Sequence, residues 1–232
     1  MIQSRTELEE NLGRIRDGIA AACRRSGRDP AGVRLVAATK TVQPGPIRWA
    51  LELGIEEFGE NYVQELVAKR QAVGGGRWHY VGTLQSHTAT RVAEHADVVH
   101  SLVPGRAAGR LARRARRRPG PLPALVQVDL AGGRHGVGEG EVPEAVAETS
   151  ALDGIEVIGL TILPPAPSRA EDSRPSFRRL RELRDEQARG HPGLRDLSMG
   201  MSEDYEVAVE EGASMVRIGT ALFGSRPSAP TG

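Results

Sequence analysis

A short apolar run, Leu35-Val36-Ala37-Ala38, stands between Arg34 and Thr39-Lys40. Such a run indicates a strand that is buried on both faces, as in a parallel sheet covered by helices. A helical pattern follows it at about residues 46–53, and the same order of buried strand and helix recurs along the chain. The protein is therefore expected to consist of repeated strand–helix units.

Eight runs of this kind are expected to be strands. They are Arg34–Lys40, Glu57–Asn61, Trp78–Gly82, Val98–Leu102, Ala124–Leu130, Glu156–Leu163, Asp196–Gly200 and Met215–Gly219. Helical segments are expected between them at about 46–53, 62–72, 86–95, 104–116, 142–151, 175–189 and 203–211. A further amphipathic helix precedes the first strand, because apolar residues recur at intervals of three and four from Leu8 to Ala22.

The alternation favours a single (β/α)8 TIM barrel of the α/β class with an extra N-terminal helix within residues 1–27. Dividing 232 residues by eight gives 29 per unit, the size of one strand–helix repeat. One domain is expected to span residues 1–232, with a flexible Pro-, Ser- and Gly-rich tail at 225–232. An open doubly wound sheet is the alternative, but residues 38–44 lack the glycine-rich turn that such sheets often carry after the first strand.

The composition is that of an ordinary globular protein, with 39% hydrophobic and 26% charged residues. A net charge of +1 gives no support for a general polyanion-binding role. The single cysteine, Cys23, cannot form an internal disulfide, which suggests a reducing compartment. The first ten residues include acidic ones where a signal peptide is apolar, and no apolar run reaches the roughly 18 residues that span a bilayer. We therefore expect a cytoplasmic protein without membrane contact.

Functional side chains of such barrels gather where the strands end. Lys40 ends the first strand, so its ammonium group is expected at the barrel mouth, partly desolvated and close to Arg217. Desolvation and a neighbouring cation favour the uncharged amine, which attacks an aldehyde to form a Schiff base. The chain has 29 arginines and only two lysines, Lys40 and Lys69, so a lysine here is more than a convenient positive charge. The alternative is a strand-end lysine that simply reaches solvent.

The loops after the last two strands contain Ser202 and Gly219-Thr220. Barrels often hold a phosphate group with backbone N–H groups of these two loops, where glycine permits close approach. Ser202 is also expected to cap the helix at 203–211. Arg217 shares a strand face with Gly219, and it is expected either to pair with a carboxylate or to donate to a ring nitrogen of a ligand. A phosphate-bearing ligand is therefore favoured.

Three other features carry weaker signals. His79, between Trp78 and Tyr80, is by itself more typical of a hydrogen-bonded core histidine. The stretch Arg106–Arg118 contains seven arginines and is expected to be a solvent-exposed helix face. Contact with nucleic acid is the less favoured interpretation, because no aromatic residue interleaves with the arginines. No Cys/His cluster has the spacing of metal ligands.

Five segments carry a family resemblance. They are Leu35-Val36-Ala37-Ala38-Thr39-Lys40-Thr41, Phe58-Gly59-Glu60-Asn61-Tyr62-Val63-Gln64-Glu65, Trp78-His79-Tyr80-Val81-Gly82-Thr83-Leu84-Gln85-Ser86, Ser198-Met199-Gly200-Met201-Ser202 and Met215-Val216-Arg217-Ile218-Gly219-Thr220-Ala221-Leu222-Phe223-Gly224. Together they resemble the pyridoxal phosphate homeostasis protein family, whose members are single-domain relatives of the N-terminal barrel of alanine racemase. The resemblance extends from about residue 8 to residue 226.

This resemblance implies an alanine-racemase-like barrel, of fold type III among pyridoxal 5'-phosphate (PLP) proteins, that binds PLP through a Schiff base. The residues implied in cofactor binding are Lys40 for the Schiff base, Ser202, Gly219 and Thr220 for the phosphate, Arg217 for the pyridine nitrogen, and Asn61 and His79 as further lining. The implied role is to carry or buffer PLP in vitamin B6 and amino-acid homeostasis, without robust catalytic turnover. Transient contact with PLP-dependent apo-enzymes is a further implication.

The residues agree with weak reactivity. An arginine beside the pyridine nitrogen favours the unprotonated ring, a poorer electron sink, although racemases work with the same arrangement. In racemases a second domain supplies the opposing catalytic tyrosine, whereas this chain ends soon after the eighth strand. The expected lack of a second domain also favours a monomer. An amino-acid racemase or another PLP enzyme using Lys40 is the main alternative, and a phosphosugar Schiff-base aldolase is a third. The chain departs from the family pattern at Val42, His87-Thr88 and Arg134, where relatives often have a lysine.

Overall fold

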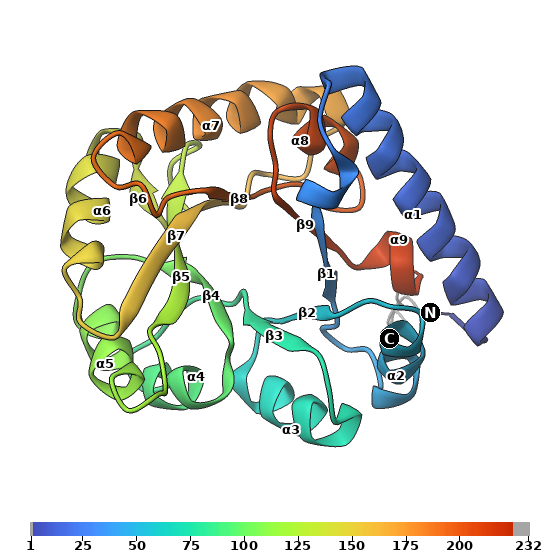
Figure 1. Cartoon of the computed structure of the whole chain (residues 1–232), viewed down its shortest axis with the longest axis horizontal. Coiled ribbons are helices and arrows are strands. Elements are labelled where there is room, and N and C mark those ends of the chain that lie inside the picture. Colours follow the sequence, from blue (N-terminus) through green and yellow to red (C-terminus); the bar gives the residue numbers. More distant parts are fainter. Residues whose placement is uncertain (1, 225–232) are drawn as a thin grey trace, which may run out of the picture.

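Eight parallel strands close into a barrel in the computed structural model, which describes residues 2–224 (Figure 1). They are β1 (Arg34–Ala38), β2 (Glu57–Glu60), β3 (Arg77–Tyr80), β4 (Val98–Leu102), β5 (Leu122–Asp129), β7 (Ile155–Ile162), β8 (Asp196–Ser198) and β9 (Met215–Ile218). Each strand pairs in parallel with its neighbours in the chain, and β9 pairs with β1, which closes the ring. The expected (β/α)8 barrel is thus confirmed. The tail expected to be flexible, 225–232, lies outside the described residues.

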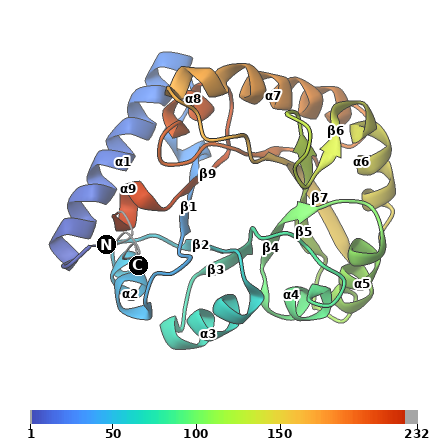
Figure 2. The same cartoon turned by 180° about the vertical axis from the view of Figure 1, so that it is seen from behind.

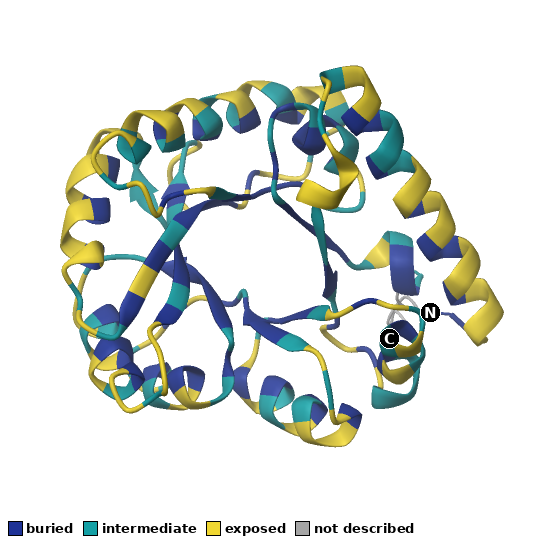
Figure 3. Cartoon of the chain, viewed as in Figure 1, coloured by how far each residue is buried: buried dark blue, intermediate teal, exposed yellow. Residues whose placement is uncertain are grey.

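Helices form an outer ring around the strands, as Figures 1 and 2 show from opposite sides. The α-helices are α1 (Arg5–Ser26), α2 (Pro44–Glu52), α3 (Val63–Val73), α4 (Ala89–His95), α5 (Arg106–Ala115), α6 (Val142–Ser150), α7 (Arg174–Ala188), α8 (Tyr205–Glu210) and α9 (Thr220–Phe223). Short 3-10 helices are η1 (Pro30–Gly32), η2 (Glu139–Glu141) and η3 (Ala170–Ser173). Their buried faces turn toward the strands (Figure 3). None of the helices within residues 2–224 has the length and apolar character needed to cross a membrane.

The structure differs from the expected elements in several places, and three of them matter most for the site and its surroundings. A two-residue strand, β6 (Val137–Gly138), pairs with β5, and two residues are too few to produce a periodic signal. The strand β1 ends at Ala38, so Lys40 lies in the following turn. The helix α8 begins at Tyr205 with Asp204 at its N-cap position, so the expectation that Ser202 caps this helix is wrong.

The buried apolar side chains of residues 2–224 form two clusters. Side chains of a strand alternate between the two faces of the barrel wall. A small cluster of Val36, Val98, Leu125 and Met215 therefore lies inside the barrel. The larger cluster packs between strands and helices and includes Trp78 and Phe58, whose ring centroids are 5.2 Å apart. The barrel interior also holds buried polar side chains, among them His79, His100 and Arg217.

Helix α1 covers the seam where the first and last strands meet. Its buried stripe, which includes Leu8, Leu12 and Ile15, packs against α8 and α9. Asn11 Nδ2 donates to the Leu222 carbonyl at 2.9 Å. The helix ends at Gly27, which adopts the left-handed conformation that favours glycine.

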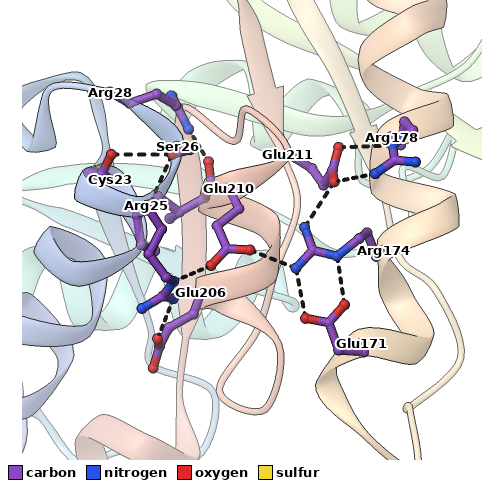
Figure 4. Close-up of polar contacts among 12 residues, drawn as sticks. Cys23, Arg25, Ser26, Arg28, Glu171, Arg174, Arg178, Glu206, Glu210 and Glu211 are labelled. Carbon is purple, nitrogen blue, oxygen red and sulfur yellow. Dashed lines mark hydrogen bonds and ion pairs between the residues drawn. The ribbon is translucent and has the colours of Figure 1, made fainter.

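A network of ion pairs ties α1, α7 and α8 together (Figure 4). Arg174 of α7 donates to Glu171, Glu210 and Glu211 at 2.6–2.9 Å. Glu210 also accepts from Arg25 of α1 at 2.5 Å. Because Glu210 pairs with arginines of both α1 and α7, and Arg174 pairs with three carboxylates, the arginines of this side of the barrel act as structural cross-links.

Candidate cofactor site

A cavity of about 220 Å³ opens at the barrel mouth, where β1, β8 and β9 end. Its lining residues are Ala38, Lys40, Ala166, Pro167, Met201, Ser202, Glu203, Asp204, Arg217, Gly219 and Thr220. This set contains five of the seven residues expected to form the site. Asn61 and His79 do not line the cavity.

Lys40 stands in the turn just beyond the rim of the barrel. Its side chain is among those that line the cavity at the mouth, as Ala38 does. Its side chain has no hydrogen bond or ion pair with another residue of the described part of the chain. Partial desolvation was expected for this amine, but Lys40 is exposed because the strand already ends at Ala38. The next residue, Thr41, has a φ of 67°, an uncommon left-handed conformation for a β-branched residue.

The other lysine, Lys69, fixes the backbone next to Lys40. Lys69 Nζ donates to the Thr39 carbonyl at 2.7 Å, to Glu60 Oε1 at 2.6 Å and to Glu65 Oε2 at 2.7 Å. The Thr39 hydroxyl donates to the same Glu60 oxygen at 2.6 Å. Lys69 is 7% exposed and Glu60 is fully buried, so water does not compete for these bonds. We call this set of Thr39, Glu60, Glu65 and Lys69 the lysine clamp.

Lys69 has no role among the residues expected to form the site. Two signals could have found it: it is the only other lysine of the chain, and it follows Glu65 by four residues on a helix, the spacing of a helical ion pair. Burial raises the pKa of Glu60, and the hydrogen bond from Lys69 opposes that shift. The other oxygen of this carboxyl group, Oε2, is buried and has no hydrogen-bond partner within residues 2–224.

The loops after β8 and β9 lie side by side and present backbone donors to the cavity. Ser202 Oγ accepts from the backbone N–H of Ala221 at 3.1 Å, which joins the two loops. A Cβ atom at Gly219 would lie 3.4 Å from the Ala38 carbonyl oxygen, so the second loop packs closely against β1. In the described part of the chain, the N–H groups of Ser202 and Thr220 donate to no protein acceptor. Such free donors suit an anionic group.

Two acidic residues, Glu203 and Asp204, lie next to the anion cradle formed by the free N–H groups of Ser202 and Thr220, and they differ in burial. Asp204 is buried, and its carboxylate accepts from the Ser173 hydroxyl and the Met201 N–H, both at 2.7 Å. Its charge is therefore used within the fold. Glu203 is exposed at the cavity edge. Both oxygens of the Asp204 carboxylate thus accept donors of the fold and do not occupy the free N–H groups of Ser202 and Thr220.

Arg217 of β9 forms the cavity wall next to the barrel interior. It is 8% exposed and donates to the hydroxyls of Ser198 and Thr161 and, at 2.8 Å, to the Ile162 carbonyl. It has no ion pair with a carboxylate in the described residues. Burial lowers the pKa of Arg217 to about 10, so the group stays charged at neutral pH. With three N–H groups bonded out of five, it keeps donors for an acceptor in the cavity.

A polar column continues from Arg217 through the barrel interior. Ser198 Oγ lies 3.0 Å from His100 Nδ1, and His100 Nε2 lies 2.7 Å from His79 Nδ1. His79 Nε2 in turn lies 3.1 Å from Glu57 Oε2, a close contact without the geometry of a hydrogen bond. Burial lowers the pKa of His79 and lowers that of His100 well below its ordinary value, so both rings are neutral at neutral pH. His79, expected as a lining residue, reaches the cavity only through His100, Ser198 and Arg217.

Asn61 has a backbone role in the structure. It is half-buried and directly follows β2. A Cβ atom at Gly82 would clash with the Asn61 carbonyl oxygen, so the chain after β3 needs glycine to pass this point. Between residues 2 and 224, no cluster of histidine, cysteine, aspartate or glutamate side chains has the geometry of a metal site.

A parallel barrel with a lysine, a buried arginine and free backbone donors at its mouth belongs to the class of barrels whose mouth can hold an anionic ligand. The family profile described as "Alanine racemase, N-terminal domain" matches residues 11–227. The pyridoxal phosphate homeostasis protein of Aquifex aeolicus is 40% identical over 222 residues, covering 94% of this chain and 97% of that protein. The protein of the same name from Escherichia coli K12 is 35% identical over 227 residues, covering 95% and 97%. The chain therefore belongs to the alanine racemase N-terminal domain family and to the pyridoxal phosphate homeostasis proteins within it.

Solved structures agree with this assignment. The structure of PipY from Synechococcus elongatus PCC7942 with PLP bound has a TM-score of 0.82 and 32% sequence identity, and the match covers 94% of this chain and all of that one. Lysine decarboxylase from Selenomonas ruminantium matches with a TM-score of 0.70 at 12% identity, over 94% of this chain and 61% of the enzyme. The second likeness concerns the fold alone.

Proposed function

We propose that this protein binds PLP through a Schiff base on Lys40 and carries or buffers the cofactor in vitamin B6 and amino-acid homeostasis. The observation that supports this most is the convergence of Lys40, Arg217, Ser202 and Thr220 on one cavity. The names of relatives at 35–40% identity and the PLP-bound PipY structure favour the same cofactor.

The residues of the cavity fit the parts of this cofactor. The N–H groups of Ser202 and Thr220 and the Ser202 hydroxyl would hold the phosphate, with Gly219 giving it room. Arg217 would donate a hydrogen bond to the pyridine nitrogen, and Lys40 would attack the aldehyde. When bound, the cofactor supplies a reactive aldehyde conjugated to an electron-accepting ring. A permanent donor at the ring nitrogen keeps that nitrogen unprotonated and weakens the ring as an electron acceptor.

We further propose that the protein has no robust catalytic turnover. Racemisation needs acid–base groups on both faces of the cofactor ring. Among the described lining residues, the side chains that could exchange protons besides Lys40 and Arg217 are Glu203 and Asp204, and Asp204 is buried in hydrogen bonds within the fold. Only the exposed Glu203 then remains to oppose the lysine.

The binding proposal is tested by absorption spectroscopy of the purified full-length protein with added PLP. A visible band of the Schiff base is expected, and borohydride reduction followed by peptide mass spectrometry should place the adduct on Lys40. The Lys40→Ala and Lys40→Arg variants should lack both the band and the adduct, the second while retaining positive charge. An unchanged band in these variants, or an adduct on another residue, would overturn the assignment.

The carrier role is tested by amino-acid α-proton exchange in deuterated water. Exchange far below ordinary enzyme turnover of roughly 1–1000 per second is expected for a carrier. Exchange at such rates, lost in Glu203→Gln, would favour a racemase instead. We also propose that the protein acts as a cytoplasmic monomer with transient contacts to PLP-dependent apo-enzymes. Sedimentation velocity and the rate of apo-enzyme reactivation by the loaded protein test these two points.

A further inference from the structure

Five arginines converge on one hollow of the outer surface, far from the cavity at the barrel mouth. The hollow has a volume of about 490 Å³ and is lined by Thr90, Arg106, Arg110, Arg113, Arg114 and Arg117. We call it the α5 hollow, because these arginines belong to α5 or to the turn after it. Helix α5 lies across the barrel from β1 and β9 (Figures 1 and 2).

Four of these guanidinium groups have no charge partner. Arg106, Arg110, Arg113 and Arg117 are exposed, and none makes an ion pair or a hydrogen bond through its side chain with another residue of the range 2–224. Only Arg114 is paired, with Glu94 at 2.8 Å. The sequence contains no acidic residue between Asp97 and Asp129, so the helix and its flanks cannot supply one.

This arrangement works against the helix itself. Like charges three or four residues apart, such as Arg106 and Arg110 or Arg110 and Arg113, repel each other and destabilise a helix. The arginine-rich helix α7 has the same residue type in a different setting, because its Arg174 and Arg178 are paired with carboxylates (Figure 4). The unpaired state of α5 is therefore more than a consequence of an arginine-rich composition.

We propose that the α5 hollow binds the phosphate backbone of a double-stranded nucleic acid, independently of base sequence. Guanidinium groups bind phosphates bidentately, and a row of them on one helix face tracks a row of phosphates. The sequence alone favoured a plain solvent-exposed face; the structure adds that the unpaired charges meet in one concave site.

Two observations favour a duplex over a protein partner and over a single strand. A protein partner would need apolar or aromatic anchors, but the large exposed hydrophobic side chains of the described residues are Tyr62 and Leu163, which do not line the hollow. A single strand is normally held by stacking its bases on aromatic rings, and no aromatic residue lines the hollow. A duplex stacks its bases inside and presents rows of phosphates on its outer surface.

The test measures fluorescence anisotropy of a labelled DNA duplex about two helical turns long, titrated with the full-length protein at several salt concentrations. Four phosphate contacts predict that log K falls with log salt with a slope of about −3.6, at about −0.9 per contact. Weak binding, with Kd on the order of 10⁻⁴–10⁻⁶ M at physiological salt, is expected for contacts without base readout.

The decisive variant is R106Q/R110Q/R113Q/R117Q, which should weaken duplex binding at low salt by at least about 10-fold and reduce the slope toward zero. A matched control, R24Q/R169Q/R189Q/R195Q, removes the same charge from exposed arginines outside the hollow and should keep the slope. Circular dichroism melting should show both variants folded.

Several results would overturn the proposal. They are no duplex binding at low salt, an equal loss in the matched control, tighter binding of a single strand of the same length, and tighter binding of poly-glutamate than of the duplex. The last result would point to an acidic protein surface. None of these measurements depends on PLP, so failure here leaves the proposed function standing.

Discussion

The two lysines of the chain lie in contrasting regions of the molecule. Lys40 stands exposed at the barrel mouth without a partner among the described residues, whereas Lys69 is buried below it with three acceptors within 2.7 Å. A compact ammonium group with three donors fits among three converging oxygens, which the planar fork of arginine would not. The contrast indicates that this arginine-rich chain has lysine where arginine cannot replace it: as the proposed nucleophile and as a buried donor to three acceptors.

The largest effect is expected from Lys69→Met. This change leaves the fully buried Glu60 without its cation, and breaking a buried ion pair in this way costs about 3–5 kcal/mol of unfolding free energy. Urea denaturation measures it. The double variant Lys69→Met/Glu60→Gln should recover part of the loss, because it removes the uncompensated charge. A loss below about 1 kcal/mol in the single variant would mean that the lysine clamp is not formed in solution.

The pH dependence of stability tests whether the two buried histidines of the polar column stay neutral in the folded state. Burial lowers the pKa of His79 and His100, to which nearby Arg34, Arg77 and, for His100, Arg217 contribute, while Glu57 opposes the shift at His79. Below about pH 6.5 these two histidines bind protons in the unfolded chain but stay neutral in the folded state. The unfolding free energy should therefore fall as pH decreases, by up to about 1.4 kcal/mol per pH unit for each histidine. Urea melts between pH 7.5 and 5 measure this slope, which His100→Gln should reduce.

A smaller effect is expected from Lys69→Arg, which keeps the charge but changes its shape. The guanidinium group cannot place three donors within the same buried space, so a loss of about 1–3 kcal/mol is expected. The Schiff-base band should also weaken, because the Thr39 carbonyl that positions Lys40 loses its donor. Equal stability of this variant and the wild type would show that the clamp needs only a positive charge.

The smallest effect on stability is expected from Lys40→Ala. An exposed side chain without partners contributes within about 0.5 kcal/mol, so the urea midpoint should hardly move while PLP binding through the Schiff base is lost. A large destabilisation would contradict the contrast between the two lysines, because it would give Lys40 a structural role.

The sequence was sufficient for the barrel and for the convergence of five expected residues on one cavity. Buried parallel strands leave clear apolar runs, and a barrel brings the ends of its strands together, so Lys40, Ser202 and Arg217 could be placed before the structure was known. The partners of His79 could not be predicted in this way. Its contact with His100 depends on the stagger between strands, which local patterns do not encode. Lys69 likewise acquires its role only when α3 packs beside β1 and β2.

The polar column links the mouth of the barrel to its opposite end. It begins at Arg217 on the wall of the mouth and ends at Glu57, which also lines a hollow of about 350 Å³ beside Arg34, at the start of β1. Each neutral imidazole in such a chain must settle on one tautomer according to its neighbours. A ligand atom that accepts a hydrogen bond from Arg217 would therefore change which nitrogens of His100 and His79 carry protons, although it contacts neither ring. The nitrogen chemical shifts of His79 would therefore change when a ligand occupies the cavity at the mouth.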